Sequence, residues 1–408
     1  MQKASKSVRV EYERKDDKLA NKDPLRIGVL FSQTGVTSRI GQSQLQGTLL
    51  GIEEVNDAGG VDGREVVPVI YDAQSDPRQY AALAEKLIVE DRVNTIFGCY
   101  MSSSRKAVIP IIERWNKLLF YPTLYEGFEF FNNLIYTGAA PNQNSVQLAE
   151  YMTANFGARA YLIGSDYIYP WESNRIMKEL IQQRPDSALL GERYVKLDAG
   201  ALDFKPILED IKAKQPDFIF STVVGDSTNS LYQAYADAGF DPQRMPIASL
   251  TTSEAEISQM LPGTAAGHFT AAPYFQSIRT DVNQRCLERF RRRFGHGVMP
   301  NLCWEAAYFQ VHLFANAARL AGSDEINLLM PHLLGSEFQA PQGKVRIDER
   351  NHHTCLYPRI GRVDPNGQFT IMREATRAVH PDPYLVTHSL GDWTVKLPNQ
   401  IDEPAGGD

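Results

Sequence analysis

Short hydrophobic runs alternate with amphipathic stretches along most of the chain. The runs are apolar at consecutive positions, which is typical of strands buried on both faces of a sheet. They lie within residues 25–35, 65–76, 93–104 and 117–127, and four more follow beyond about residue 140. The stretches between them repeat apolar residues every three or four positions, which predicts helices. The alternation therefore predicts parallel sheets covered on both faces by right-handed crossover helices.

The alternation is long enough for two such units. A chain of 408 residues is too long for one ordinary hydrophobic core. No low-complexity linker divides it, so we expect two doubly wound α/β lobes joined by several short crossings, with a ligand cleft between them. The expected boundaries are 25–138 plus 277–354 for the first lobe, 139–276 plus 355–396 for the second, 1–24 for a charged N-terminal extension and 397–408 for a tail.

Three loops that follow predicted strands carry the candidate chemistry. Parallel sheets bind ligands beyond the carboxyl ends of their strands, so two facing units would bring these loops to one cleft. The loops span residues 98–105, 120–127 and 164–172 and are rich in tyrosine, serine and threonine. Tyrosine supplies an apolar wall and a hydroxyl in one side chain. The loops therefore predict a pocket for a small, compact ligand.

Each candidate also has a structural interpretation. The serines at 102–104 would serve equally as caps of a helix that begins near Arg105, and we expect one of them to do so. Tyr121 fits the end of a buried strand as well as a ligand pocket, and Tyr125 is expected to pack. Tyr167 and Tyr169 are harder to assign to a core because Pro170 follows them directly.

The loops favour a neutral ligand. An amino acid would require anion donors, which Ser102 to Ser104 could supply, and a carboxylate for its ammonium group. No acid in the three loops is an obvious choice for the second role, although Glu254 could reach the cleft. A phosphate ligand would require a glycine-rich cradle, and the P-loop pattern is absent.

Neither catalysis nor a metal site is expected. The sequence has no G-x-S-x-G or H-E-x-x-H motif, and none of its eight histidines lies in the three loops. The four cysteines match no zinc pattern. In the stretch 351–355, "NHHTC", neighbouring side chains on a strand would point to opposite faces, which disfavours joint ligation. We therefore expect a non-enzyme without cofactor or metal.

Charge and hydropathy bear on nucleic-acid binding, membrane insertion and cellular location. The net charge is −7, and the single dense basic run, 289–297, fits the last turn of a helix, so no nucleic-acid surface is expected. No stretch is apolar enough to span a membrane. The first 24 residues lack the apolar core of a signal peptide, which favours a cytoplasmic location; a periplasmic location remains the alternative if a signal has been removed.

Several motifs resemble those of the type I periplasmic-binding-protein fold and, within it, the amide-sensing negative regulators of bacterial aliphatic amidase operons. The resemblance covers nearly the whole chain. "NDAGGVDGR" is shared by the wider superfamily, whereas "GSDYIYP" and "LTTSEAE" are more specific. The matching stretches also include "GVLFSQTGVT", "GCYMSSSRKAVIP", "YPTLYEGFE", "APNQNS", "FSTVVGDST", "APQGKVRID" and "HPDPYLV".

The resemblance implies that a short-chain amide binds between the lobes. The family's ligand contacts, transferred by motif, fall on Ser102, Tyr121, Thr123, Tyr167 and Tyr169, with Tyr100 as a weaker addition. Leu124 departs from the regulators, which have proline at this position, so amide preference is open. The serine run also replaces a Ser-His-Thr sequence.

Two functions follow from the resemblance. The first is an amide-responsive negative regulator that holds an antiterminator partner silent. The alternative is the substrate-binding component of an ABC transporter for urea or short-chain amides, which is similar in sequence; "GDSTN" (225–229) and "IGRVDPNGQFTI" (360–371) favour it. The expected ligand is a small neutral, acetamide-like amide or urea. Self-association into a homo-oligomer is compatible with either function.

Overall fold

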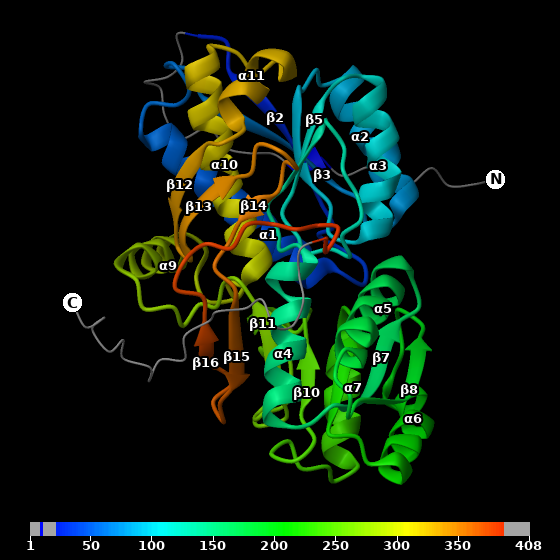
Figure 1. The fold of residues 1–408 in the computed structure, drawn as a ribbon. Coiled ribbons are helices and arrows are strands. Elements are labelled where there is room, and N and C mark those ends of the chain that lie inside the picture. Colours follow the sequence, from blue (N-terminus) through cyan, green and yellow to red (C-terminus); the bar gives the residue numbers. More distant parts are fainter. Residues whose placement is uncertain (1–8, 11–21, 387–408) are drawn as a thin grey trace, which may run out of the picture.

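The structure is a computed structural model that describes residues 9, 10 and 22–386. Most of the predicted N-terminal extension (1–24) and the whole predicted tail (397–408) lie outside the described residues. In the described part the chain forms two α/β lobes, drawn one above the other in Figure 1. The expected fold class, two doubly wound α/β lobes, is confirmed.

The first lobe is built on a six-stranded sheet. The interior strands are parallel, and only the short β1 at the edge runs antiparallel, against β3. Because the chain moves from β2 outward to β3 and then returns to place β4 on the other side of β2, the sheet has a switch point between β2 and β4. The strands, in spatial order, are β1 (Arg9–Val10), β3 (Val66–Asp72), β2 (Leu25–Phe31), β4 (Thr95–Gly98), β5 (Leu118–Tyr121) and β6 (Leu134–Tyr136).

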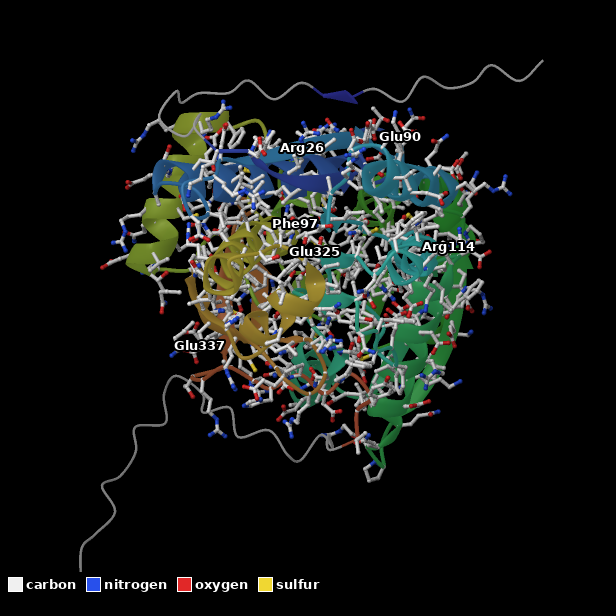
Figure 2. All side chains as sticks on the ribbon, turned by 90° about the horizontal axis from the view of Figure 1, so that it is seen from above. Arg26, Glu90, Phe97, Arg114, Glu325 and Glu337 are labelled. Carbon is white, nitrogen blue, oxygen red and sulfur yellow. The ribbon has the colours of Figure 1, made fainter. Side chains whose placement is uncertain are left out.

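Helices cover both faces of this sheet. On one face α1 (Ser38–Asp57) packs along α10 (Leu302–Ala321), and on the other α2 (Pro77–Val89) packs against α3 (Ser102–Arg114). The inward side chains interlock: the Phe97 ring centroid lies 5.0 Å from that of Phe120 and 5.6 Å from that of Phe314. Figure 2 shows Phe97 in the interior, whereas charged side chains such as Glu90 and Arg114 lie at the periphery.

The second lobe has a seven-stranded mixed sheet. Its first five strands are parallel, and the sequence predicted four of them. The fifth, Phe269–Ala272, and the two antiparallel strands at one edge were not anticipated. Helices α4 (Ser145–Asn155), α5 (Ile168–Gln182), α6 (Ala201–Lys214) and α7 (Asp226–Asp237) cover it, with the short α8 (Glu254–Ile257) at the carboxyl edge. The strands, in spatial order, are β8 (Ala188–Val195), β7 (Arg159–Ser165), β9 (Phe218–Thr222), β10 (Ile247–Ser249), β11 (Phe269–Ala272), β15 (Arg359–Val363) and β16 (Phe369–Glu374).

The chain passes between the lobes several times. The first crossing contains the 3-10 helix η2 (Pro141–Gln143), and the second connects β11 to α9 (Asp281–Phe294), whose last turn is basic as predicted. After α11 (Ile326–Leu333), a small antiparallel sheet of β12 (Glu337–Ala340), β13 (Gly343–Ile347) and β14 (Thr354–Cys355) leads into the third crossing. The segment after β16 then returns to the first lobe, where Phe128 N donates to Pro383 O at 2.9 Å. The residue boundaries of the lobes remain a prediction.

Candidate functional site

Four of the six candidate residues lie where two neighbouring strands of the first lobe end. Tyr100 follows β4 and Ser102 begins α3, while Tyr121 ends β5 and Thr123 follows it. All four side chains are buried. Since β4 and β5 are adjacent parallel strands, their carboxyl ends bring these loops together at one edge of the sheet.

The serine run does not cap α3 in the expected way. The helix begins at Ser102 itself, and its N-cap is Met101, which offers no side-chain hydrogen bond. The expectation of a serine cap is therefore wrong. Ser102 Oγ instead donates to Glu126 Oε2 at 2.5 Å and accepts from Arg105 Nη1 at 3.1 Å. With its proton committed to Glu126, Ser102 is a weak donor for a ligand.

Ser102 belongs to a buried, charge-balanced network. Arg105 pairs with Glu126 at 3.1 Å and with Glu129 at 2.8 Å, and Lys106 reaches Glu129 at 3.0 Å. Burial by itself would lower the pKa of Arg105, but the neighbouring Glu126 and Glu129 raise it above its ordinary value. Two cations face two carboxylates, so the network presents no free charge to a ligand.

Thr123 keeps a proton to donate. Gln44, on α1, donates from Nε2 to Thr123 Oγ1 at 2.9 Å, so the threonine hydroxyl accepts here and can donate elsewhere. The Gln44 Oε1 atom is buried and has no hydrogen-bond partner among the described residues. Tyr121 is used differently, because its hydroxyl donates to the carbonyl oxygen of Tyr100 at 2.5 Å. No sequence pattern pointed to Gln44, which lies far from the three loops along the chain.

The second lobe contributes the two tyrosines of the opening turn of α5. Tyr167 is the N-cap residue and is half-buried. Tyr169 is the second residue of the helix and is buried. Their ring centroids are 6.3 Å apart. Burial raises the pKa of Tyr169, and the nearby Ser173 offsets part of this rise, but the Tyr169 hydroxyl has no hydrogen-bond partner among the described residues.

The six candidates come together across the two lobes. Burial raises the pKa of Tyr167, and the nearby Tyr169, Tyr121 and Glu126 raise it further, which places Tyr167 beside the network of the first lobe. Burial also raises the pKa of Tyr100, and Tyr167 and Tyr169 add to that rise, so Tyr100 lies near both of them. We call this set the interlobe cluster: Tyr100, Ser102, Tyr121, Thr123, Tyr167 and Tyr169.

Two further residues border the interlobe cluster. Cys303, in the first turn of α10, is buried near Thr123, Tyr100 and Tyr169, and burial raises the pKa of its thiol. Glu256 of α8 is near Tyr100, and its carboxylate accepts from Ser253 N at 2.8 Å and Ser253 Oγ at 2.6 Å. Burial raises the pKa of Glu256 to about 7. The S-x-x-E capping box at 253–256 is a readable signal for Glu256, whereas nothing in the sequence singles out Cys303.

The lobes meet closely beside the cluster. A narrow crevice of about 10 Å³ separates them, lined by Tyr100 and Val36 on one side and by Gly225 and Glu256 on the other. A Cβ atom added at Gly225, whose φ is +65°, would lie 2.5 Å from the carbonyl oxygen of Val36. The structure therefore holds the lobes in a closed arrangement at this point.

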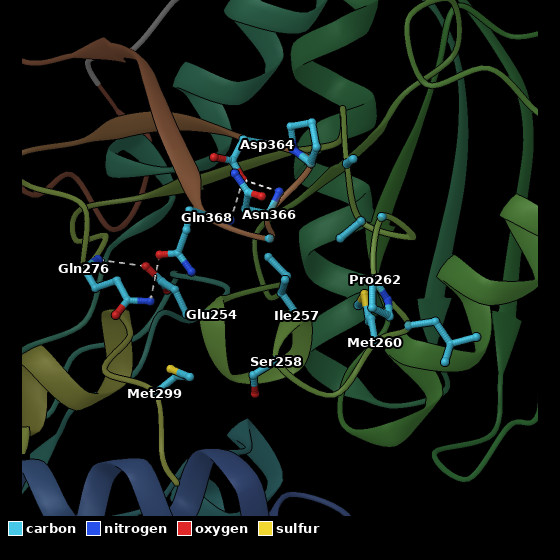
Figure 3. Close-up of a pocket in the computed structure, with 16 residues that line it drawn as sticks. Glu254, Ile257, Ser258, Met260, Pro262, Gln276, Met299, Asp364, Asn366 and Gln368 are labelled. Atoms are coloured by element: carbon cyan, nitrogen blue, oxygen red, sulfur yellow. Dashed lines mark hydrogen bonds between the residues drawn. The ribbon is translucent and has the colours of Figure 1, made fainter. Parts of the chain in front are cut away.

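Glu254 does not serve the interlobe cluster. It lines a separate hollow of about 430 Å³ together with Gln276, Gln368 and Met299 (Figure 3). Its Oε1 atom accepts from Gln276 N at 2.8 Å, and its Oε2 atom is buried without a partner among the described residues. Burial raises the pKa of Glu254 to about 8, with nearby Glu256 adding to the shift. The suggestion that Glu254 reaches the ligand cleft is corrected accordingly.

A model of the family described as periplasmic binding protein domain matches residues 25–390. The chain belongs to the periplasmic binding protein family. One relative in this family is the leucine-, isoleucine-, valine-, threonine-, and alanine-binding protein of Pseudomonas aeruginosa. It is 25% identical over 336 residues, which cover 80% of this chain and 87% of the relative.

A solved periplasmic binding protein has the same fold. The solute-binding protein of an ABC transporter from Rhodopseudomonas palustris BisB5, in complex with 3,4-dihydroxybenzoic acid, matches with a TM-score of 0.80 and 19% identity. The match covers 88% of this chain and 99% of that structure. A limonene hydroxylase of Geobacillus stearothermophilus is 25% identical over 150 residues, 35% of this chain, but this is only 27% of that protein, so it carries no argument about activity.

These relatives bear on the functional hypotheses drawn from the sequence. The relatives that match over most of their length are binding proteins rather than enzymes, in line with the expected non-enzyme. They lend no support to an amide ligand, an antiterminator partner or a cytoplasmic location. Among the described residues, no helix has the length and apolarity needed to cross a bilayer.

Proposed function

We propose that this chain is the solute-binding component of an ABC transporter and that it captures a small uncharged polar solute, an amide or urea, between its lobes. The family and the transporter relatives support the first part of the proposal. The chemistry of the interlobe cluster supports the second. The periplasmic location expected of such a component is the one that the family favours.

The observation that carries the proposal is the cancellation of charge beside the interlobe cluster. Arg105 already faces Glu126 and Glu129, and Ser102 already donates to Glu126. A zwitterionic or anionic ligand would need charges of its own to be matched, because burying an unpaired charge is costly. A neutral ligand makes no such demand, and it would meet aromatic walls and hydroxyl groups.

The hydrogen-bonding groups near the cluster complement an amide. The Thr123 hydroxyl accepts from Gln44 and lies beside the Cys303 thiol, a weak acceptor, so its proton can be donated to a ligand carbonyl oxygen instead. The Gln44 Oε1 and Tyr169 hydroxyl oxygens have no partner among the described residues and can each accept an N–H. A primary amide or urea offers one carbonyl oxygen and at least two N–H groups, which suits one donor and two acceptors.

Calorimetric titration of protein that has been unfolded and refolded, to remove bound solute, tests the proposal. Acetamide, butyramide, urea, leucine and 4-hydroxybenzoate serve as the test solutes. We expect the amides or urea to bind and the two charged solutes to bind at least tenfold more weakly. Tighter binding of leucine or 4-hydroxybenzoate would overturn the neutral-ligand assignment and leave the family assignment intact.

The second candidate function is the amide-responsive negative regulator. It is favoured by the combination of Thr123 with the "DYIYP" loop, in which the sequence resembles the amidase regulators. A ligand would release the antiterminator partner only through different affinities for two arrangements of the lobes. Co-purification with an antiterminator that is lost on adding amide supports this function; export of the native protein to the periplasm contradicts it.

A further inference from the structure

Three potential metal ligands meet on segments that are distant in the sequence. Cys355 Sγ lies 3.6 Å from His380 Nδ1, and the same nitrogen lies 3.3 Å from Asp348 Oδ2. All three donor atoms fall within 4.8 Å of one another. The sequence analysis considered only the neighbouring His352 and His353 as companions of Cys355. The structure places both elsewhere: His353 Nε2 contacts the Tyr125 hydroxyl at 2.5 Å, and the His352 ring packs edge-on against Phe130.

The spacing suits a tetrahedral zinc ion. Zinc binds thiolate sulfur at about 2.3 Å and imidazole nitrogen or carboxylate oxygen at about 2.0–2.1 Å, so tetrahedral neighbours lie roughly 3.3–3.6 Å apart. The separations of His380 Nδ1 from Cys355 Sγ, 3.6 Å, and from Asp348 Oδ2, 3.3 Å, agree with these values, and the third pair lies within 4.8 Å. Cysteine, histidine and aspartate are also the ligand types that zinc prefers.

The surroundings hold two of the ligands and leave the third accessible. Cys355 and Asp348 are buried, and Asp348 Oδ1 accepts from Arg350 N at 2.9 Å, which fixes the carboxylate. The His380 side chain is 64% exposed, which provides an entry path and room for water as a fourth ligand. The Arg350 guanidinium lies 3.6 Å from Asp348 Oδ2, but it is 83% exposed and can move away into solvent.

The three ligands lie where interlobe segments converge. Cys355 is at the end of β14, where the chain leaves the first lobe, and His380 is on the returning segment, which Figure 1 shows in red beside β14. Leu356 and Val379 pair as a β-bridge next to the two ligands. The first crossing is hydrogen-bonded to both of these segments: Asn142 Nδ2 donates to His380 O at 2.8 Å, and Gln143 Nε2 donates to Thr354 O at 2.9 Å.

We propose that Asp348, Cys355 and His380 form a binding site for a divalent transition metal, zinc first, that fastens the segments connecting the two lobes. The site is separate from the interlobe cluster and does not depend on the proposed solute. Binding replaces the thiol proton by the metal, so each metal ion bound at the site releases one proton to solution. A cysteine thiol with an ordinary pKa of about 8.5 is largely protonated at neutral pH, so the apoprotein carries that proton.

Titration of chelator-treated full-length protein with cobalt(II) tests the site, because cobalt reports its ligands by visible absorption. We expect one equivalent to bind with tetrahedral d–d bands and a thiolate-to-cobalt charge-transfer band, and zinc to displace it. His380→Ala removes an exposed ligand without disturbing the core and is expected to weaken binding about 100-fold or more, at least as much as the loss of an outer-shell partner. Cys355→Ser is expected to abolish the charge-transfer band.

His332→Ala is the matched control, because His332 is also exposed but lies on α11, in the last turn of that helix. It should bind cobalt like the unaltered protein. Zinc should also raise the Tm of the unaltered protein and of His332→Ala, but not of His380→Ala, since a ligand specific to the folded state stabilises it. Equal cobalt affinity in His380→Ala, or bands without thiolate character, would overturn the proposal without touching the proposed solute function.

Discussion

Gln44 donates from its Nε2 atom to the hydroxyl oxygen of Thr123 at 2.9 Å, across 79 positions of sequence. The bond orients the threonine hydroxyl: its oxygen accepts from Gln44, and its proton points away from Gln44, toward the Cys303 thiol or a ligand carbonyl. The proposed recognition of a solute carbonyl by the interlobe cluster uses this arrangement.

Thr123→Val keeps the shape of the side chain and removes the hydroxyl. We expect solute affinity to fall roughly 2- to 12-fold, the equivalent of a lost hydrogen bond of about 0.5–1.5 kcal/mol. Tyr167→Phe should weaken binding to a similar extent, with little change in the unfolding midpoint. Calorimetry and thermal unfolding measure the two quantities; unchanged affinity in both variants would place the solute elsewhere.

Tyr169→Phe should separate stability from binding. The Tyr169 hydroxyl is buried without a hydrogen-bond partner among the described residues, and such a group costs about 1–3 kcal/mol. Its removal is expected to raise the free energy of unfolding by about 1 kcal/mol while solute affinity falls. Denaturant unfolding and calorimetry on the same preparation provide the two values. A loss of stability would show that the hydroxyl already has a partner.

Gly225→Ala should hinder closure of the lobes. The new Cβ would lie 2.5 Å from Val36 O, so we expect solute affinity to fall at least tenfold. Gly295→Ala is the matched control: φ and ψ are +65° and −150° at Gly225 and +74° and −150° at Gly295, but a Cβ at Gly295 meets nothing within 4 Å. Both variants share the backbone strain, so only the first should affect binding. Equal effects would assign the loss to strain.

Arg105→Met should destabilise the protein strongly. It leaves Glu126 and Glu129 buried without their guanidinium partner, which typically costs about 3–5 kcal/mol. Lys106→Met removes a cation from the same network, but the Lys106 side chain is 46% exposed, so its loss should cost less than about 1 kcal/mol. Denaturant unfolding at neutral pH compares them. A small cost for both would mean that the carboxylates find other partners or become protonated.

Glu254→Gln should change how stability depends on pH. Burial raises the pKa of Glu254 from 4.5 to about 8 in the folded state, so that state retains a proton which the unfolded chain loses. Wild-type stability should therefore fall as pH rises from about 4.5 to about 8, and the glutamine variant lacks this contribution. We expect equal stability at about pH 4 and an advantage for the variant of roughly 5 kcal/mol at about pH 9. Parallel pH curves would contradict the assignment.

The sequence by itself determined the alternation of strands and helices, the two-lobed α/β class and the three loops of the cleft. These features follow from local rules: buried parallel strands require consecutive apolar residues, and the carboxyl ends of such strands meet at one edge. Tyr167 and Tyr169 could be selected because the local signals around them, a strand before and a proline after, are adjacent in the chain.

Only the tertiary structure decided which groups are free to act. Ser102 donates to Glu126, Gln44 orients Thr123, and Cys303 of α10 lies beside Thr123. Each of these contacts joins residues that are far apart in sequence. The antiparallel strands β15 and β16 and the meeting of Asp348 with His380 likewise depend on where separate crossings between the lobes converge. Periodicity reports which face of an element is buried, but the partner of a polar side chain is set by packing between elements, which no local pattern encodes.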